Sequence, residues 1–409
     1  MTLEGRRLLV AMSGGIACYK ACEVVRLCAR DGAVVQVLMT AGARAFVSPL
    51  TLQTLSGRPV ATDTFDPGEE STIGHIRLAD ESEAIVVAPA TANTLAKAAQ
   101  GIADDLLGTV LLATRAPVLW APAMNVNMWE HPATRTNLAT LQGRGARVVG
   151  PATGSLACGW EGAGRLAEPA AIVEALRCLL GPQDLAGERV LVSAGPTREP
   201  VDPVRYLSNH SSGKMGHAVA RVARRRGAEV TLVTGPTSLP PPDGVRTVAV
   251  ETAAEMGAAL AAEFPRATVL VMAAAVADYR VRRPAEQKLK KTGRTMTLDL
   301  ERNDDLLAGL AARKGRRLVI GFAAETEAVV AEGMRKLREK RLDLVVANDV
   351  TAPGAGFGSD TNVVHLVTGD GSAAALPVMA KDEVAGRILD WVVARRRRPA
   401  VGPARRRLR

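Results

Sequence analysis

The sequence predicts an α/β protein with two doubly wound domains. Short runs rich in valine, leucine and alanine alternate with longer amphipathic stretches, as in parallel strands joined by crossover helices. The alternation stops at Gly181-Pro182-Gln183-Asp184 and resumes at Arg189, and 409 residues suit two or three domains of about 150 residues. We therefore expect two Rossmann-like domains, residues 1–181 and 189–394, with a linker at residues 182–188.

The first half of the chain supplies a strand–helix–strand unit and two further strands. Residues 7–12 are an apolar strand, Ser13-Gly14-Gly15 is a turn, and an amphipathic helix at residues 16–30 leads to a strand at 33–39. Later strands are predicted at residues 84–88 and 117–121, with helices at 94–99, 106–114 and 170–180.

The second half repeats this organisation after the break. Strands are predicted at residues 189–193, 229–233, 267–273, 318–322 and 344–347. Helices are predicted between them at residues 213–226, 253–264 and 327–340. The sequence shows no tandem repeat.

The net charge of +10 could indicate nucleic-acid binding, but eight arginines lie among the last fifteen residues, which leaves +2 for the rest of the chain. We predict that residues 395–409, interrupted by Pro399 and Pro403, form a disordered tail. Binding of RNA or an acidic surface by this tail stays an alternative, but nucleic acid is not the partner we expect. The absence of an apolar run of about eighteen residues and of a signal peptide predicts a cytoplasmic protein with no membrane association.

Five cysteines in a chain of this length argue against a disulfide framework. Cys18 and Cys22 have i,i+4 spacing, but no further Cys or His cluster completes a metal site. We therefore expect these two, with Cys28 and Cys178, to be thiols that pack between helices. Cys158 alone is expected in a loop.

Two loops of the first domain place small polar groups at the ends of strands. Ser13-Gly14-Gly15-Ile16 offers backbone N–H groups and a hydroxyl at a helix N-terminus, which suits a phosphate but could equally be an ordinary glycine turn. The segment at residues 89–94, which includes Ala90 and Thr91, adds hydroxyls and an amide. Neither loop is a GxGxxG motif, and together they favour FMN over NAD.

Two further segments carry unusual side chains. Pro122-Ala123-Met124-Asn125-Val126-Asn127-Met128-Trp129 follows a strand, at the edge where open α/β sheets bind ligands. Residues 153–165 surround Cys158 with small residues. A Met- and Trp-bearing turn is often core, and a lone cysteine is often inert. Their occurrence together and in this order favours a binding site.

Together with Gly74-His75-Ile76, these segments resemble the flavin-dependent cysteine decarboxylase family. The family's motifs occur here in the family's order: Pro-Ala-Met-Asn-x-x-Met-Trp, Ala-Cys-Gly and Gly-x-Gly-Arg. The resemblance implies a flavodoxin-like FMN-binding cysteine decarboxylase fold for the first domain. It implies that Cys158 donates a proton, His75 acts as a base, Asn125 holds a substrate carboxylate or amide, and Met128 and Trp129 wall the pocket. The implied FMN-binding residues are Ser13, Gly14, Gly15, Ile16, Thr40, Ala90 and Thr91.

The second domain carries a different set of motifs. Ser208 and Met215 stand where a GxxxxGK[ST] loop needs Gly and Ser or Thr, so the Gly213-Lys214 pair is not a Walker A motif. Instead residues 208–216 resemble the phosphopantothenate–cysteine ligase family. The residues that carry the same resemblance are 193–200, 274–280, 288–291, 321–325 and 347–350.

The ligase resemblance implies roles for individual residues. Nucleotide contacts are implied for Asp278, Lys288, Phe322, Lys336 and Lys340; Asn209 would bind the acyl-nucleotide intermediate; and substrate or nucleotide contacts extend to Ala274, Ala275, Asp304, Asp305, Leu306 and Leu307. The lysines could equally be solvated surface residues. Where the family reads Lys-Asn-Pro-Asp, this chain has Arg302-Asn303-Asp304-Asp305, which loses a proline. Mg²⁺ is implied, its ligands stay open, and Asp278 is a candidate.

The two resemblances together imply a bifunctional enzyme of coenzyme A biosynthesis. Its C-terminal domain would join 4'-phosphopantothenate to cysteine with CTP through an acyl-cytidylate. Its N-terminal domain would decarboxylate the product to 4'-phosphopantetheine with FMN, and a homo-oligomer is implied. A prenyltransferase, a peptide-cysteine decarboxylase and a non-catalytic regulator are the alternatives. The ligase domain argues against the first two, and Cys158 with Asn125 argues against the third.

Overall fold

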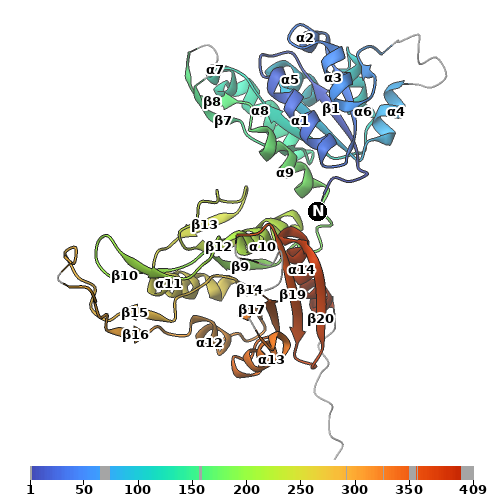
Figure 1. Cartoon of the computed structure of the whole chain (residues 1–409). Coiled ribbons are helices and arrows are strands. Elements are labelled where there is room, and N and C mark those ends of the chain that lie inside the picture. The colour runs from blue at the N-terminus through green and yellow to red at the C-terminus, as the bar shows by residue number, and fades with distance from the viewer. Residues whose placement is uncertain are drawn as a thin grey trace, which may run out of the picture. The chain divides into compact units, whose positions relative to one another are not determined.

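The computed structural model describes residues 2–64, 74–155, 159–291, 293–325, 327–349, 356 and 358–397 (Figure 1). Contacts divide the chain into two compact units, which meet between Gly181 and Pro182. Each unit is described by itself. No helix in the described parts of the chain is long and apolar enough to cross a membrane.

The first unit is built on a parallel sheet with the strand order β3-β2-β1-β4-β5-β6. Its strands are β1 (Arg7–Met12), β2 (Val34–Met39), β3 (Val60–Ala61), β4 (Ala84–Ala90), β5 (Val118–Pro122) and β6 (Arg147–Val148). The chain runs outward from β1 to β3 and then returns to the other side of β1 at β4. Ligands of open α/β sheets bind where the strand order reverses in this way, at the carboxyl ends of the strands.

Helices cover both faces of this sheet (Figure 1). They are α1 (Cys18–Arg30), α2 (Ala41–Arg44), α3 (Pro49–Ser56), α4 (Gly74–Glu81), α5 (Ala92–Gln100), α6 (Leu106–Ala113), α7 (Val126–Glu130), α8 (Pro132–Gly143) and α9 (Pro169–Leu179). Alternation along β1 divides the core: Leu8 and Val10 pack with α1, α3 and α9, whereas Leu9 and Ala11 pack with α4, α5, α6 and α8. The predicted doubly wound fold is confirmed for this unit.

The second unit contains an eight-stranded sheet, β13-β12-β9-β14-β17-β18-β19-β20, in which the last two strands are antiparallel. The strands are β9 (Arg189–Ala194), β12 (Glu229–Thr234), β13 (Arg246–Ala249), β14 (Val269–Met272), β17 (Leu318–Glu325), β18 (Leu344–Asp349), β19 (Thr361–Thr368) and β20 (Ala373–Ala380). Two small hairpins accompany it, β10 (Arg198–Pro200) with β11 (Tyr206–Ser208) and β15 (Tyr279–Val281) with β16 (Leu300–Arg302).

Helices again pack on both faces. α10 (Lys214–Arg225) and α14 (Lys381–Arg397) belong to one core cluster, and α11 (Ala253–Glu263), the 3-10 turn η2 (Phe264–Arg266), α12 (Leu306–Ala311) and α13 (Val329–Glu339) belong to the other. The second doubly wound domain is therefore confirmed. The antiparallel pair β19–β20 was not predicted; β20 is largely exposed, and its alanines and a proline disfavour a strand.

Two expectations about the ends of the second domain need correction. Residues in the predicted linker pack on this unit, since Leu185 is 1% exposed in its core and Asp184 forms an ion pair with Arg226 at 2.6 Å. The disordered tail was predicted to begin at residue 395, but α14 continues through Arg397. Arg396 donates to the Thr268 carbonyl at 2.7 Å and pairs with Glu188 at 3.1 Å. The rest of the tail, residues 398–409, lies outside the described residues.

Candidate functional sites

Loops after adjacent strands of the first unit are joined by a buried hydroxyl. Ser13, at the end of β1, is 2% exposed, and its Oγ donates to the Pro89 carbonyl at 2.7 Å. The same oxygen accepts from the Thr91 backbone N–H at 3.0 Å and lies 3.3 Å from the Thr91 hydroxyl. The predicted β1 and β4 loops are therefore fixed against each other at the strand-order reversal.

The glycines of the β1 loop allow a close approach to the next loop. A methyl group on Gly14 would lie 2.6 Å from the carbonyl carbon of Gly42, so only glycine fits here. Thr40 caps α2 by accepting from the Ala43 N–H at 3.3 Å. The backbone N–H groups of Gly14, Gly15 and Ile16 donate to no group in the described part of the chain. Unsatisfied N–H groups beside hydroxyls at a strand-to-helix turn fit the phosphate of a mononucleotide.

The Met-Asn segment lies at the end of the neighbouring strand. The Ala123 N–H donates to the Ala90 carbonyl at 3.1 Å, which links the β5 loop to the β4 loop. Asn125 caps α7, with its Oδ1 accepting from the Asn127 N–H at 2.8 Å. Met128 is 49% exposed and free to wall a pocket. Trp129 is 5% exposed and packs in the core, as the packing alternative predicts, and a role in the pocket wall stays a prediction.

The glycine-rich segment forms a hairpin that was not predicted, β7 (Ala152–Ser155) with β8 (Glu161–Arg165). Methyl groups on Gly162 and Gly164 would lie 2.8 Å from Val126 Cγ2 and 2.3 Å from the Met124 carbonyl oxygen. The Met124 N–H also donates to the Gly164 carbonyl at 2.9 Å. The Gly-x-Gly-Arg pattern thus lets β8 lie directly against the Asn125 loop. Cys158, between the two strands, lies outside the described residues.

His75 is half-buried in the first turn of α4, a helix that the sequence did not predict. The chain passes from β3 through α4 to the parallel strand β4, so the N-terminus of α4 faces the carboxyl edge of the sheet. This edge also carries the loops at Ser13, Thr91 and Asn125.

Three of the remaining cysteines of the first unit pack in or against its core, as predicted. Cys18 and Cys28 are completely buried in the core, with Cys22 packed against it. Burial raises the pKa of the Cys28 thiol to about 12, which leaves it protonated and unreactive. No group of three or more His, Cys, Asp or Glu side chains suited to a metal occurs among the described residues.

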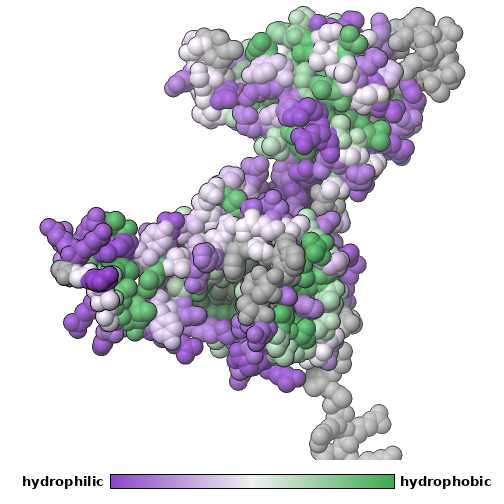
Figure 2. Space-filling view, in the orientation of Figure 1, coloured by the Kyte–Doolittle hydropathy of each residue, from purple (hydrophilic) through white to green (hydrophobic). Residues whose placement is uncertain are grey.

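The second unit contains a cavity of about 570 Å³. Figure 2 shows a hollow with hydrophobic residues at its floor on this unit. The cavity gathers nearly all of the residues that were predicted for nucleotide or substrate contacts: Asn209, Ala274, Ala275, Asp278, Asp304, Asp305, Leu306, Leu307, Phe322, Lys336 and Lys340. Lys288 is the exception, because it is exposed and does not line the cavity.

Buried hydroxyls hold one of the loops that line this cavity. Ser193 and Thr197, both completely buried, accept from the N–H groups of Ala274 at 3.2 Å and Ala277 at 3.0 Å. These two hydroxyls therefore hold the loop after β14. The Asn209 amide donates to the Val276 carbonyl at 3.0 Å and so joins the N-terminal approach of α10 to the same loop.

Lysines and carboxylates line another part of the cavity. Lys336 pairs with Glu325 at 2.7 Å, and Lys340 pairs with Asp305 at 2.8 Å. Burial, the largest single influence, would raise the pKa of the Asp305 carboxyl, but the bond to Lys340, the bond from the Ala308 N–H and the nearby positive charges together lower it. Each of the two lysines is therefore held at the cavity by an ion pair with an acidic partner.

The departure from the family pattern at Asp304 leaves the loop well anchored. Asn303 is 8% exposed; its amide donates to the Ala277 carbonyl and its N–H to the Asp278 carbonyl, both at 2.8 Å. Asp305 caps α12 by accepting from the Ala308 N–H at 2.9 Å. Since residues on both sides of Asp304 are fixed, the missing proline is compensated locally.

Sequence reasoning assigned no role to several cavity residues. Lys214 and Lys381 line it from the N-terminal ends of α10 and α14. Asn348, within a motif that carried the family resemblance, has a buried Oδ1 with no hydrogen-bond partner in the described structure. Such an acceptor is suited to a ligand donor. Lys381 is a basic residue at the start of a helix, and nothing in the sequence marks it as a cavity residue.

Comparisons with known proteins agree with this arrangement. The model of the Flavoprotein family matches residues 1–181, and that of the DNA/pantothenate metabolism flavoprotein C-terminal domain matches residues 185–395. The Coenzyme A biosynthesis bifunctional protein CoaBC of Vibrio cholerae is 46% identical over 394 residues, 96% of this chain and 98% of the relative. The chain belongs to the family of coenzyme A biosynthesis bifunctional proteins. The proteins of this name from Escherichia coli K12 and Bacillus subtilis 168 are also 46% identical, over 97% and 96% of this chain and 98% of each relative.

Membership of the coenzyme A biosynthesis bifunctional protein family confirms the family predicted from the motifs. The chain is a flavoprotein and a bifunctional enzyme of coenzyme A biosynthesis, with decarboxylase and ligase activities. The first family match ends at residue 181, where the first compact unit also ends, and the second begins at residue 185.

Proposed function

We propose that the second domain ligates 4'-phosphopantothenate to cysteine with CTP, and that the first domain decarboxylates the resulting 4'-phosphopantothenoylcysteine with FMN. The ligase cavity carries this proposal, because it gathers residues from at least five separate segments around one space of about 570 Å³. That volume is within the range of sites that enclose small organic ligands. The first domain contributes the joined loops at the strand-order reversal.

The ligase reaction needs cations, because both substrates are anionic. In the first step a carboxylate oxygen of 4'-phosphopantothenate attacks the α-phosphorus of CTP, and pyrophosphate leaves. Lys336 and Lys340 lower the repulsion between the two anions and stabilise the charge that develops on the phosphate. In the second step the amine of cysteine attacks the acyl carbon, and CMP leaves. Asn209, held against the loop after β14, positions the acyl group for this attack.

Mg²⁺ would enter this cavity with the nucleotide. Asp278 is exposed at the cavity wall, and its backbone is held by the Asn303 N–H at 2.8 Å. Mg²⁺ is commonly bound by one or two carboxylates together with substrate phosphates, so a single carboxylate suffices. Asp278 is the residue we propose as its protein ligand.

The first domain fits FMN through its backbone and its hydroxyls. The N–H groups of Gly14, Gly15 and Ile16 would hold the phosphate, with Ser13 and Thr91 fixing the loops around it. Bound FMN supplies reversible two-electron chemistry at the substrate carbon that bears sulfur. We assign to Asn125 the binding of the substrate carboxylate or amide, to His75 the role of base and to Cys158 the donation of a proton. Thr40 and Ala90 complete the set of cofactor contacts.

Assembly and location follow as further parts of the proposal. Ile16, Phe46 and Met128 are 59%, 49% and 49% exposed, and apolar side chains this exposed are suited to subunit contacts. We propose that the enzyme is a homo-oligomer that acts in the cytoplasm. Native mass spectrometry of the full chain gives the subunit number, and a monomer at micromolar concentration would contradict the assembly.

The experiment that tests the ligase half replaces one cavity residue. Asn209→Asp should lower the rate of CTP-dependent amide formation at least about tenfold, because the variant loses the amide donor and adds an anion. Asn137→Asp, on α8 of the first unit, is the control and should leave ligation unchanged. Wild-type ligation by a folded Asn209→Asp protein would overturn this role.

A further inference from the structure

Two lysines to which the sequence analysis assigned no role approach the ligase cavity from different helices. Lys214 is the first residue of α10 and Lys381 the first residue of α14, and both line the cavity. A helix N-terminus has a partial positive charge, so a cation there is unfavourable unless an anion accompanies it. Two such cations beside one cavity therefore call for an anionic partner.

Both ammonium groups bind the same short segment. Lys214 Nζ donates to the Gly358 carbonyl at 2.8 Å and to Asp360 Oδ1 at 2.7 Å. Lys381 Nζ donates to the Thr361 carbonyl at 2.9 Å and to the Ser359 carbonyl. An ammonium group has three N–H donors, so with respect to the described residues each lysine keeps one donor beyond these two bonds.

The charges of this cluster do not balance. Lys381 is 8% exposed; burial lowers its pKa, the charge of Lys214 lowers it further, and Asp360 opposes the shift. Asp360 is the carboxylate that pairs with Lys214 among the described residues, and its side chain is 90% exposed to solvent. Two cations thus share one solvated carboxylate, and a buried ammonium in such surroundings is costly.

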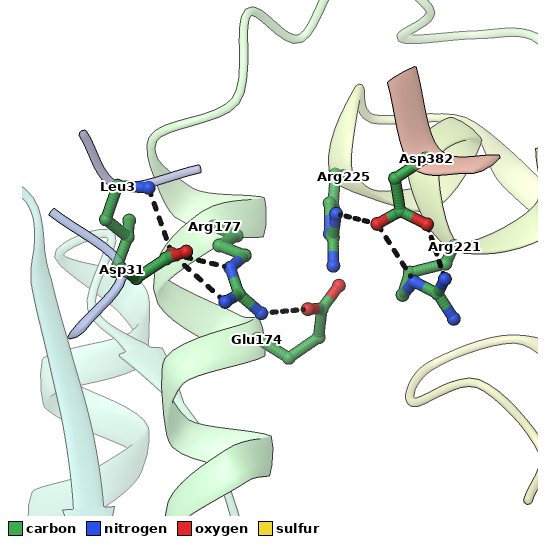
Figure 3. Close-up of polar contacts among 7 residues, drawn as sticks. All are labelled: Leu3, Asp31, Glu174, Arg177, Arg221, Arg225 and Asp382. Carbon is green, nitrogen blue, oxygen red and sulfur yellow. Dashed lines mark hydrogen bonds and ion pairs between the residues drawn. The ribbon is translucent and has the colours of Figure 1, made fainter. Parts of the chain in front are cut away.

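A second polar network holds Lys381 in place. Its neighbour Asp382 lies between Arg221 and Arg225 of α10 (Figure 3), with Asp382 Oδ2 at 2.8 Å from Arg225 Nη1 and 3.3 Å from Arg221 Nε. The Arg225 side chain is 4% exposed. Because these bonds join the first turn of α14 to α10, the helix that begins with Lys214, the two lysines are preorganised.

We propose that Lys214 and Lys381 form a binding site for a substrate phosphate group, separate from the Lys336 and Lys340 pair on the α13 side of the same cavity. The inference rests on the proposed ligase function, whose two larger substrates each carry phosphate. A phosphate oxygen would accept the remaining N–H donors and supply the negative charge that the cluster lacks. Its source is either the nucleotide triphosphate or the 4'-phosphate ester of the pantothenate substrate.

The test measures ligase steady-state kinetics of Lys381→Met and Lys214→Met in the full chain. Methionine is unbranched like lysine but one atom shorter, and it removes the charge. Each variant should raise KM for one phosphate-bearing substrate by about tenfold or more, with the KM for cysteine unchanged. Lys381→Arg and Lys214→Arg keep the charge and should recover part of the loss.

The matched control is Lys314→Met. Lys314 also donates to a backbone carbonyl, that of Arg341 at 2.7 Å, and to a carboxylate, Asp343 at 2.8 Å, but it does not line the cavity. It should leave every KM unchanged. Thermal unfolding of each variant shows whether it is folded, and Lys214→Met, whose wild-type side chain is 30% exposed, is the variant that tolerates the change more readily.

Dephosphorylated pantothenate separates the two sources. If the site binds the 4'-phosphate, the variants and the wild type should use pantothenate with equal kcat/KM. If the site binds the nucleotide, the KM of the variants for CTP should rise with either pantothenate or 4'-phosphopantothenate as the second substrate. Pyrophosphate should then inhibit the variants more weakly than the wild type. Unchanged KM values for both phosphate substrates in folded variants would overturn the inference. Variants that lose decarboxylase activity together with ligase activity would also count against the inference. If the proposed ligase function itself is wrong, the wild type will show no ligation.

Discussion

Gly14→Ala tests the proposed FMN phosphate loop with the smallest possible change. The added methyl would lie 2.6 Å from the Gly42 carbonyl carbon and 2.8 Å from its Cα and oxygen. Carbon atoms in contact prefer about 3.5–4.0 Å, so two backbone segments must separate by about 1 Å. Overpacking of this kind costs about 1–3 kcal/mol, and alanine recovers about 0.4–1 kcal/mol by restricting the unfolded chain. We expect a net loss of about 1–2 kcal/mol in the free energy of unfolding of the first domain.

The assay combines urea unfolding with an FMN titration of the apoprotein. Gly15→Ala is the control in the same loop, because its methyl would meet only Thr91 Cγ2, at 3.8 Å. The control should keep the stability of the first domain, whereas Gly14→Ala should lower both stability and FMN affinity. Trp120 and Trp129, both buried, report on this domain in a Trp391→Phe background, which removes the tryptophan of the second domain. Equal behaviour of the two variants would refute the close-approach argument.

Three further predictions concern single residues. Cys158→Ala should keep its flavin spectrum but fail to complete decarboxylation, and full turnover measured by mass spectrometry would remove the thiol from the reaction. Asn209→Asp should leave decarboxylation of supplied 4'-phosphopantothenoylcysteine intact, as a coupled assay of both steps can check; equal loss of both activities would contradict the separation of sites. Burial lowers the pKa of His217 below its usual 6.5, so the unfolded state binds the proton more readily. Stability of the second domain should therefore fall as pH drops below about 6.5 and through the lower folded-state pKa. His217→Phe should flatten this dependence in urea unfolding between pH 7 and 5, relative to the exposed control His210→Phe, and an unaltered slope would contradict the argument.

The sheet was predictable because buried parallel strands are continuous apolar runs. The strand at residues 7–12 was predicted with its observed bounds, since all of its residues after Arg7 are buried. The hairpin of β7 and β8 escaped prediction because Gly154, Gly162 and Gly164 have no side chains to alternate. Their role appears only when the contacts with Met124 and Val126 are known.

The candidate sites were predictable where residues are grouped in motifs. Asn209 and Asp278 stand in such motifs, and the structure brings them to one cavity. Lys381 could not be found in this way, because it reaches the cavity through the packing of α14 on α10. Conversely, the resemblance assigns Lys288 to the nucleotide, yet this residue does not line the cavity of its own chain. Local sequence carries no information about either placement.

The central claim is that one chain performs both steps in separate domains. It is tested most directly by mass spectrometry of the purified protein supplied with 4'-phosphopantothenate, cysteine, Mg²⁺ and either CTP or ATP, after a visible spectrum has been recorded. The account predicts a flavin spectrum and CTP-dependent formation of 4'-phosphopantetheine. Folded protein that shows no flavin and forms neither 4'-phosphopantothenoylcysteine nor 4'-phosphopantetheine would contradict it.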